Sequence, residues 1–425
     1  MIEAFCWRGD AMETNKLLDP ITIGKRTVPN RFAINAMEGT DADANGNPSE
    51  LTYKRYKRYF EGGAGFIDLE AITCQTECVS SPHQLAITPD NEKPLKEFVT
   101  SLKSINDQNV FVFQLTHAGE LGNPGFSHPV RVTKEALPGF DHAEFIDEKQ
   151  VEKIMDELVQ GAVIAHNAGA DGIDLKLCAG YLGSQILRPF NKHEWKYGGS
   201  WENRKQFAVD LIDRIREAVS DDTFIIGSKI SLYEGIPGGQ GTMNPDSAVM
   251  DLKESIDLIR TLEAHGASYI LTTAGAPMHC VNYCKPDKAD PYFAYLGQYF
   301  QKVCRDHLHP ETVVIGGGYS IFSDGSQKNF SAVLPEKNSL VFWGDKLIRE
   351  GVTDMVALGR QALIDPYVPV KLKEGKLAEV RWCTGCDNCS ILLISPEYTG
   401  CVTDPYYARL VPKAMEFLGM KPGNC

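Results

Sequence analysis

Short apolar runs recur along the chain, and each has the length of a buried strand. The eight runs span residues 32–37, 65–70, 109–115, 171–176, 223–230, 267–272, 312–317 and 353–358. Helix-length amphipathic segments lie between them, which is typical of a parallel sheet with crossover helices. Eight repeats of this unit favour a closed (β/α)8 barrel, because that fold has eight parallel strands that are each followed by a helix.

Two of the intervening segments, 147–168 and 203–219, carry apolar residues at helical spacing, and we expect them in the outer ring of the barrel. A doubly wound open sheet is the main alternative. Such a sheet would show a GxGxxG fingerprint after its first strand, where this chain reads NAMEGTDADANG. We therefore predict an α/β fold, with a TIM barrel over residues 15–370 and a cysteine-rich extension over residues 371–425 that packs on it.

Composition and charge limit the binding partners and the cellular location that we expect for this chain. The net charge of -13 argues against a nucleic acid or an anionic membrane as partner, because both would attract clustered Lys and Arg. No apolar stretch is long enough for a membrane helix, and the first ten residues lack the basic start and apolar run of a secretory signal. We therefore expect a cytoplasmic protein in a reducing compartment.

The twelve cysteines are unevenly placed, which in a large intracellular chain indicates metal or redox use. Cys383, Cys386 and Cys389 have the spacing CxxCxxC, and Cys401 follows after eleven residues. Three close cysteines with a distant fourth near a proline fit four-thiolate ligation of a 4Fe-4S cluster. Structural zinc is the alternative, although it more often uses two separated CxxC pairs or a mixture of Cys and His. Four ordinary buried thiols are the third interpretation.

The longest motif begins in the fourth predicted strand and reads DGIDLKLCAGYLGSQILRPFNKHEWKYGGSWENRKQF. It resembles the old yellow enzyme family, in which this strand is followed by a Gly-Tyr-Leu segment and then by YGGSxENR. With the cysteine cluster, the chain resembles the branch that contains 2,4-dienoyl-CoA reductase and trimethylamine dehydrogenase. The resemblance runs from about Leu18 to Pro405 and implies a flavin-dependent oxidoreductase with FMN at the barrel mouth.

The resemblance assigns several positions to the flavin ring. Backbone after the first two strands would lie against it, at Ala36, Met37, Glu38 and Ala71. Gln114 matches a glutamine whose amide can both donate to and accept from the flavin pyrimidine edge. Lys229 stands where the family usually has arginine, near a flavin edge where a cation favours the reduced anion. An ordinary strand-end lysine is the alternative interpretation of Lys229.

Two later strands end in the glycine-rich sequences IGGGYS and LGRQAL, which resemble the family's FMN phosphate site. The resemblance implies that Gly317, Gly318 and Gly359 let backbone N–H groups approach the phosphate and that Arg360 pairs its charge. Barrels commonly bind phosphate after strands seven and eight, which agrees with this assignment.

Three further positions carry the expected catalysis. Tyr181 matches the tyrosine that protonates the substrate carbon opposite the hydride, although it could instead pack beneath its loop. His279 falls where the dienoyl-CoA reductases carry an active-site histidine, and a solvated loop histidine is the alternative. The pair that usually grips the substrate oxygen is replaced by Lys176 and Ala179. We expect Lys176 to bind a carboxylate or carbonyl oxygen instead.

The leading hypothesis is a reductase that acts on an activated carbon-carbon double bond of a small molecule. The chain ends about two dozen residues after Cys401, which leaves no room for the FAD and pyridine-nucleotide domains of the large reductases. We therefore expect NAD(P)H or a separate electron-donor protein to reduce the FMN. The sequence specifies neither the substrate nor whether the chain forms a homo-oligomer.

Two other functions remain open at this stage. An amine dehydrogenase or demethylase would need an aromatic cage for an alkylammonium group, for which Trp195, Tyr197 and Tyr233 are candidates. The non-enzymatic alternative is an electron-transfer subunit of a larger complex.

Overall fold

Eight parallel strands close into a barrel in the computed structural model, which describes residues 15–286, 292–325 and 338–420. The order around the barrel is β10-β11-β12-β3-β4-β5-β8-β9. The strands are β3 (Phe32–Ile34), β4 (Phe66–Thr73), β5 (Val110–Thr116), β8 (Gly172–Leu177), β9 (Ile225–Ser231), β10 (Tyr269–Thr273), β11 (Val313–Gly316) and β12 (Met355–Leu358). Each overlaps one predicted apolar run, so the prediction of a (β/α)8 barrel is confirmed.

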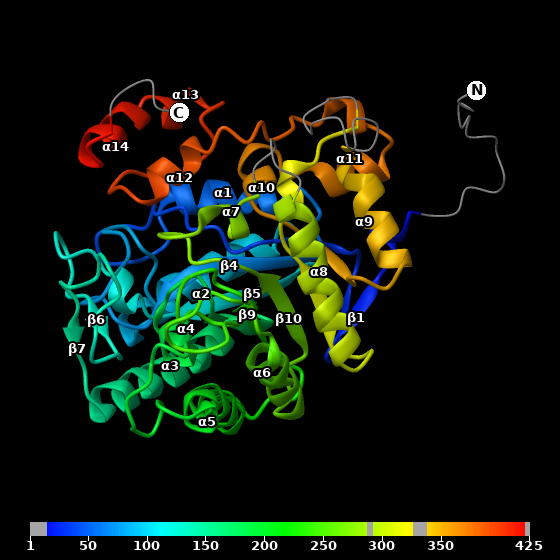
Figure 1. Cartoon of the computed structure of the whole chain (residues 1–425). Coiled ribbons are helices and arrows are strands. Elements are labelled where there is room, and N and C mark those ends of the chain that lie inside the picture. The colour runs from blue at the N-terminus through cyan, green and yellow to red at the C-terminus, as the bar shows by residue number, and fades with distance from the viewer. Residues whose placement is uncertain (1–14, 287–291, 326–337, 421–425) are drawn as a thin grey trace.

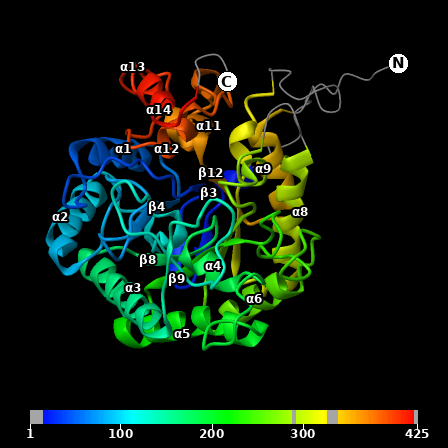
Figure 2. The same ribbon diagram turned by 60° about the vertical axis from the view of Figure 1, so that its left-hand side comes forward.

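Helices surround the strands as an outer ring (Figure 2). They are α1 (Glu50–Glu61), α2 (Glu92–Lys103), α3 (Glu148–Ala168), α5 (Trp201–Val219), α6 (Lys253–Ala264), α8 (Tyr292–His307) and α9 (Leu340–Arg349). The capping box of Asp147 and Gln150 begins α3, and Gly169 ends it with a left-handed φ of 91°. No helix of the described residues is both long and apolar enough to cross a membrane.

The side chains inside the barrel change from apolar to polar along its axis. Side chains alternate between the two faces of a strand, so Phe66 and Asp68 both point inward from β4, as Val112 and Gln114 do from β5. Phe66 and Val112 belong to the apolar cluster at the amino-terminal end. The hairpin of β1 (Ile21–Ile23) and β2 (Arg26–Val28) packs on the same cluster. The layer nearer the carboxyl ends of the strands is therefore polar.

The segment after β12 packs beside the carboxyl ends of the strands (Figure 1). It contains α10 (Arg360–Ile364), α11 (Val368–Lys373), α12 (Asn388–Leu393), α13 (Pro405–Ala408) and α14 (Val411–Phe417). The Thr40 hydroxyl donates to the Glu397 carbonyl over 2.9 Å, and the Thr399 N–H donates to the Gly39 carbonyl over 2.8 Å. The predicted domain boundary between residues 370 and 371 falls inside α11, and the division into two units stays a prediction.

Short elements complete the carboxyl-end face. They are the bridge of β6 (Val130–Arg131) with β7 (Glu144–Phe145), the helix α4 (Leu182–Leu187) directly after β8, and α7 (Val281–Cys284) in the loop after β10. These connections, together with the extension, carry the groups described next.

Candidate active site

Three of the predicted site residues meet at the carboxyl end of β8. The Lys176 ammonium donates to Glu38 Oε1 over 2.9 Å, and the Tyr181 hydroxyl donates to the same oxygen. Lys176 Nζ also lies 3.3 Å from the centroid of the Tyr181 ring. Burial, followed by the charge of Glu38, raises the pKa of Tyr181 well above its ordinary value. The phenol is therefore protonated at neutral pH.

A buried ion cluster holds the loop that carries Glu38. The Gly39 N–H donates to Glu70 over 2.6 Å, and Arg55 Nη2 donates to Glu70 over 2.5 Å and to Asp41 over 2.9 Å. A Cβ on residue 39 would lie 2.0 Å from Arg55 Nη2, so the close approach requires glycine. Burial raises the pKa of Glu70 to about 7, although Arg55 opposes the shift. The position of Glu38 thus depends on Arg55.

A polar layer lies inside the barrel directly below this mouth. Gln114 Nε2 donates to Asp174 over 2.6 Å and approaches Asp68 at 3.4 Å. Lys229 Nζ donates to Asn35 Oδ1 over 2.7 Å. Gln114 and Lys229 were predicted from the sequence, whereas the two aspartates were not. The signal was available, because both stand in the tripeptide Ile-Asp-Leu in the middle of an apolar strand.

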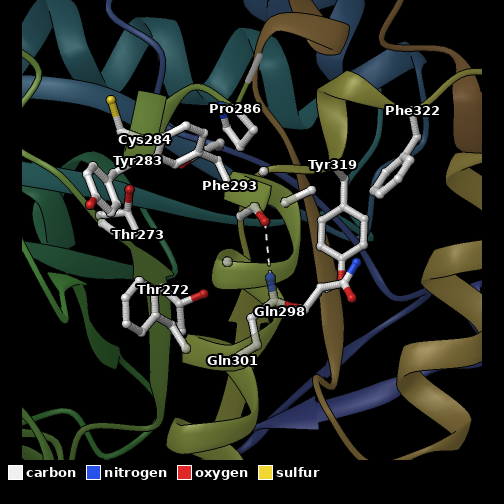
Figure 3. Close-up of a pocket in the computed structure, with 17 residues that line it drawn as sticks. Thr272, Thr273, Tyr283, Cys284, Pro286, Phe293, Gln298, Gln301, Tyr319 and Phe322 are labelled. Carbon is white, nitrogen blue, oxygen red and sulfur yellow. Dashed lines mark hydrogen bonds between the residues drawn. The ribbon is translucent and has the colours of Figure 1, made fainter. Parts of the chain in front are cut away.

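A cavity opens between the ends of β10 and β11 and the start of α8 (Figure 3). The space between its lining atoms measures about 550 Å³, a volume that includes open solvent. The predicted phosphate-binding residues Gly317 and Gly318 line it. Gly318 has a left-handed φ of 90°, and a Cβ on Gly317 would lie 2.8 Å from the Thr272 carbonyl oxygen. Glycine thus leaves backbone at the cavity wall, as a phosphate site requires.

Arg360 connects the barrel to the cysteine segment. Its guanidinium donates to Asp387 over 2.5 Å and to the Pro286 carbonyl over 3.0 Å. The preceding Gly359 N–H donates to the Ser320 hydroxyl over 3.2 Å. The guanidinium is thus already paired beside the cavity, and its role toward a phosphate stays a prediction. Ser320 and Asp387 were not predicted, although Ser320 ends the glycine-rich sequence IGGGYS and Asp387 directly follows Cys386.

The predicted cluster cysteines lie in the extension. Cys386 is exposed and the other three are partly buried, with Cys389 at the start of α12. Burial raises the pKa of the Cys389 thiol to about 11. In the part of the chain that the structure describes, no three His, Cys, Asp or Glu side chains are arranged to hold a metal ion. The four thiols fit a cluster in their donor chemistry, and the cluster itself stays a prediction.

The remaining backbone positions assigned to the flavin lie at the strand ends. The Ala36 N–H hydrogen-bonds to Asp68, and the Ala71 carbonyl accepts from Gln84 Nε2 over 3.1 Å. Met37 faces residue 359, where a Cβ would lie 3.4 Å from its sulfur. These contacts bring the ends of β3 and β4 to the same edge of the mouth.

His279 lies on the loop after β10 and is exposed, as the alternative interpretation of a solvated loop histidine expects. Its ring packs edge-to-face on Phe140 with centroids 5.6 Å apart, and burial followed by the charge of Arg188 lowers its pKa. Arg188 is itself buried and donates to Glu120 over 2.6 Å and to Glu234 over 2.7 Å. The histidine is therefore neutral at pH 7, in a wall that is partly apolar and partly ionic.

The three aromatic residues considered for an alkylammonium cage do not form one group, since Trp195 and Tyr197 pack edge-to-face while Tyr233 packs elsewhere. The Tyr197 side chain is fully buried and its hydroxyl hydrogen-bonds to Glu152 of α3. Trp195 donates its indole N–H to Asn191. Tyr233 instead packs on Tyr283 in the loop after β10. The interpretation of these residues as an alkylammonium cage was wrong. Trp195 and Tyr197 lie just before the outer helix α5 and pack against the ring of helices.

Comparison with known proteins decides the family. The model of the NADH:flavin oxidoreductase / NADH oxidase family matches residues 16–319. The chain belongs to this family. The predictions of an old yellow enzyme resemblance and of a flavin-dependent oxidoreductase are thus confirmed.

Individual relatives share the barrel at low identity. The chain is 28% identical over 376 residues to NADH oxidase of Thermoanaerobacter brockii, covering 86% of this chain and 52% of the relative. It is 24% identical to dimethylamine dehydrogenase of Hyphomicrobium sp., over 88% of this chain and 47% of the relative. It is 25% identical to cinnamate reductase of Clostridium sporogenes, over 92% and 58%. The chain therefore spans about half the length of these relatives.

A solved structure of 2-naphthoyl-CoA reductase has the same fold. It superposes with a TM-score of 0.76 at 19% sequence identity, covering 93% of this chain and 58% of that one. This likeness supports the barrel architecture and no particular substrate.

The Arg55 cluster leads to a prediction about stability. In Arg55→Met, Asp41 and Glu70 lose their cation, and we expect a loss of about 3 to 5 kcal/mol in unfolding free energy at pH 8. The loss should shrink toward pH 5. Without Arg55 the pKa of Glu70 rises further above its ordinary 4.5, so the variant loses stability as the pH rises.

Chemical denaturation at the two pH values measures this effect. Arg58→Met is the matched control, because Arg58 lies on the same helix and donates to the Ile364 carbonyl. We expect that variant to lose less stability, with little dependence on pH. Equal losses at pH 5 and pH 8 for Arg55→Met would show that the arginine acts through packing alone.

Proposed function

We propose that the chain is the catalytic barrel of an FMN-dependent ene-reductase, with Tyr181 as the proton donor. The observation that carries this proposal is the contact of Tyr181 with Glu38 and Lys176 at the end of β8. It places a protonated phenol, a carboxylate and an ammonium group together beside the proposed flavin. The kinship with a cinnamate reductase agrees with reduction of an activated double bond.

The chain offers groups for each part of FMN. Gly317, Gly318 and Gly359, with Arg360 beside them, would hold the phosphate, because their backbone lines the cavity or the start of α10. Ala36, Met37 and Ala71 would contribute backbone beside the ring. Gln114 and Lys229 would face its pyrimidine edge from below. Bound there, FMN would supply the hydride that the protein itself lacks.

The proton would come from Tyr181 as the hydride adds to the other carbon of the double bond. The phenol O–H bond breaks and a C–H bond forms on the substrate, which leaves a phenolate. Lys176, 3.3 Å from the ring centroid, would stabilise that negative charge, and solvent would return the proton. Lys176 is already paired with Glu38 and lies beside the Tyr181 ring. We therefore propose that its main role is to stabilise the Tyr181 phenolate and that binding a substrate oxygen is a secondary role.

His279 would line the substrate side of the site. Its lowered pKa keeps the imidazole neutral at pH 7, so it can donate or accept a hydrogen bond without adding charge. A small unsaturated molecule would thus lie between His279 and Tyr181, above the flavin. NAD(P)H or a partner protein would supply the electrons.

The first prediction concerns the cofactor. Protein purified without added flavin should release FMN and no FAD on denaturation, because the glycine-lined cavity is assigned to a single phosphate. Chromatography of the released flavin with both standards measures this. Release of FAD would contradict the assignment of the mouth, as would failure to bind FMN on reconstitution.

The second prediction separates the two half-reactions. Tyr181→Phe should slow reduction of an activated alkene by roughly 10²- to 10⁴-fold, the usual contribution of a positioned general acid. Reduction of the flavin by its donor should change little, since no proton from Tyr181 is needed there. Anaerobic stopped flow follows both rates through the flavin absorbance.

Tyr367→Phe is the control for this comparison. The Tyr367 hydroxyl binds Glu61 over 2.8 Å, away from the mouth, so its loss should leave both rates unchanged. If Tyr181→Phe slows both half-reactions equally, Tyr181 positions the flavin. If it slows neither, another group supplies the proton.

The third prediction concerns the extension. Cys383, Cys386, Cys389 and Cys401 would hold a 4Fe-4S cluster, which transfers single electrons. We expect about four iron and four sulfide per chain, both lost in Cys386→Ser because a hydroxyl is a poor substitute for a thiolate ligand. Cys304→Ala, in α8, should keep them. One zinc per chain, or no metal after anaerobic reconstitution, would refute the cluster.

A further inference from the structure

The two aspartates below the barrel mouth form a buried acid pair. Asp68 and Asp174 have no exposed surface, and their carboxyl groups lie in hydrogen-bonding contact with each other. Each has one oxygen, Oδ1, for which no described residue supplies a donor. A proton held between the carboxyls would satisfy such an oxygen, since a protonated carboxyl donates one hydrogen bond.

The charges around the pair agree with one shared proton. Buried charges are stable only when they are paired or hydrogen-bonded. Lys229 supplies positive charge within this layer. Lys176, two residues after Asp174 on β8, also lowers the pKa of Asp174 through its charge. With two ionised carboxylates and Lys229 the layer would carry a net negative charge. One proton on the pair makes it neutral.

The pair is one contact away from the proposed flavin. Gln114, which we assign to the pyrimidine edge, donates to Asp174 over 2.6 Å, and Asp68 binds the Ala36 N–H beside the ring. Negative charge added to the flavin therefore acts on these carboxyls through an interior of low dielectric constant. Such a charge raises the pKa of a nearby acid.

We propose that Asp174, sharing a proton with Asp68, takes up a second proton when the flavin above Gln114 is reduced. The hydride brings two electrons and one proton to the flavin. A proton from solvent then forms an O–H bond on the remaining carboxylate as its O–H bond in hydronium breaks, which leaves a water molecule. The pair thus sets how strongly the flavin potential depends on pH. The proposal deepens the proposed function and rests on flavin binding at this mouth.

The pKa values of the two aspartates allow uptake of a second proton near neutral pH. Burial raises the pKa of Asp174 to about 6, and burial with the charge of Asp174 raises the pKa of Asp68 well above its ordinary value. The groups that face Asp174 are Asp68 of β4, Gln114 of β5, Lys176 of its own strand, Cys178 just after it, Lys229 of β9 and Tyr269 of β10. At pH 7 one carboxylate therefore remains to accept the second proton.

The midpoint potential of the bound flavin, measured at several pH values between about 7 and 8, tests the proposal. For a two-electron couple each proton taken up changes the potential by about 30 mV per pH unit, the equivalent of a tenfold change in the equilibrium constant. We expect about 60 mV per pH unit for the natural chain. Asp174→Asn should give about 30 mV, because the amide cannot be protonated.

Asp68→Asn is the second variant and keeps the test valid if Asp174→Asn fails to fold. Its amide would donate to Asp174 and stabilise the carboxylate, so the steeper dependence should move to lower pH. Asp213→Asn, on the outer face of α5, is the control and should behave as the natural chain.

Specific outcomes overturn the proposal. A dependence near 30 mV per pH unit in the natural chain would do so, as would an unchanged steep dependence in Asp174→Asn. These results are distinct from failure of the ene-reductase proposal, because the potential is measured without substrate. A chain that shows the expected dependence but reduces no alkene would keep the acid pair and lose the substrate class, whereas failure to bind FMN would overturn both.

Discussion

The ion pairs of Arg55 with Asp41 and Glu70 fix the loop after β3, and much of the barrel mouth depends on them. Glu38 stands next to Gly39, whose N–H is bound by Glu70. The contact of Glu38 with Lys176 and Tyr181 therefore requires the backbone that Arg55 holds. A pairing between α1 and β4 thus determines where a carboxylate lies opposite β8.

Among the described residues, the same arrangement occurs three times around the mouth. Arg55 pairs with two carboxylates, Arg188 pairs with Glu120 and Glu234, and Lys229 lies beside two aspartates. Each group has one cation and two acids, all at least largely buried. An excess carboxyl in a buried group must be stabilised by hydrogen bonds or hold a proton. Burial accordingly raises the pKa of Glu70, Glu120 and Asp174.

The strands could be predicted from the sequence because a strand buried on both faces reads as a continuous apolar run. The motif around Tyr181 and the glycines after β11 also marked their positions. The partners of Glu38 could not be predicted, since it lies 138 residues from Lys176 and only barrel closure brings them together. The contact of Arg360 with Asp387 depends instead on how the cysteine segment folds back onto α10 after the last strand. The prediction of an alkylammonium cage from Trp195 and Tyr197 was wrong because aromatic residues in a loop beside an outer helix commonly pack against that helix.

The short helix α10 has a consequence for how this protein can change. Its N-cap Gly359 lies beside the proposed phosphate site, and its first two residues hold the cysteine segment through Asp387 and the Cys383 N–H. One turn of helix therefore contacts both the proposed phosphate site and the extension. An insertion or deletion in the cysteine segment would therefore displace the backbone beside the proposed phosphate site, so a change of length in one region requires a compensating change in the other.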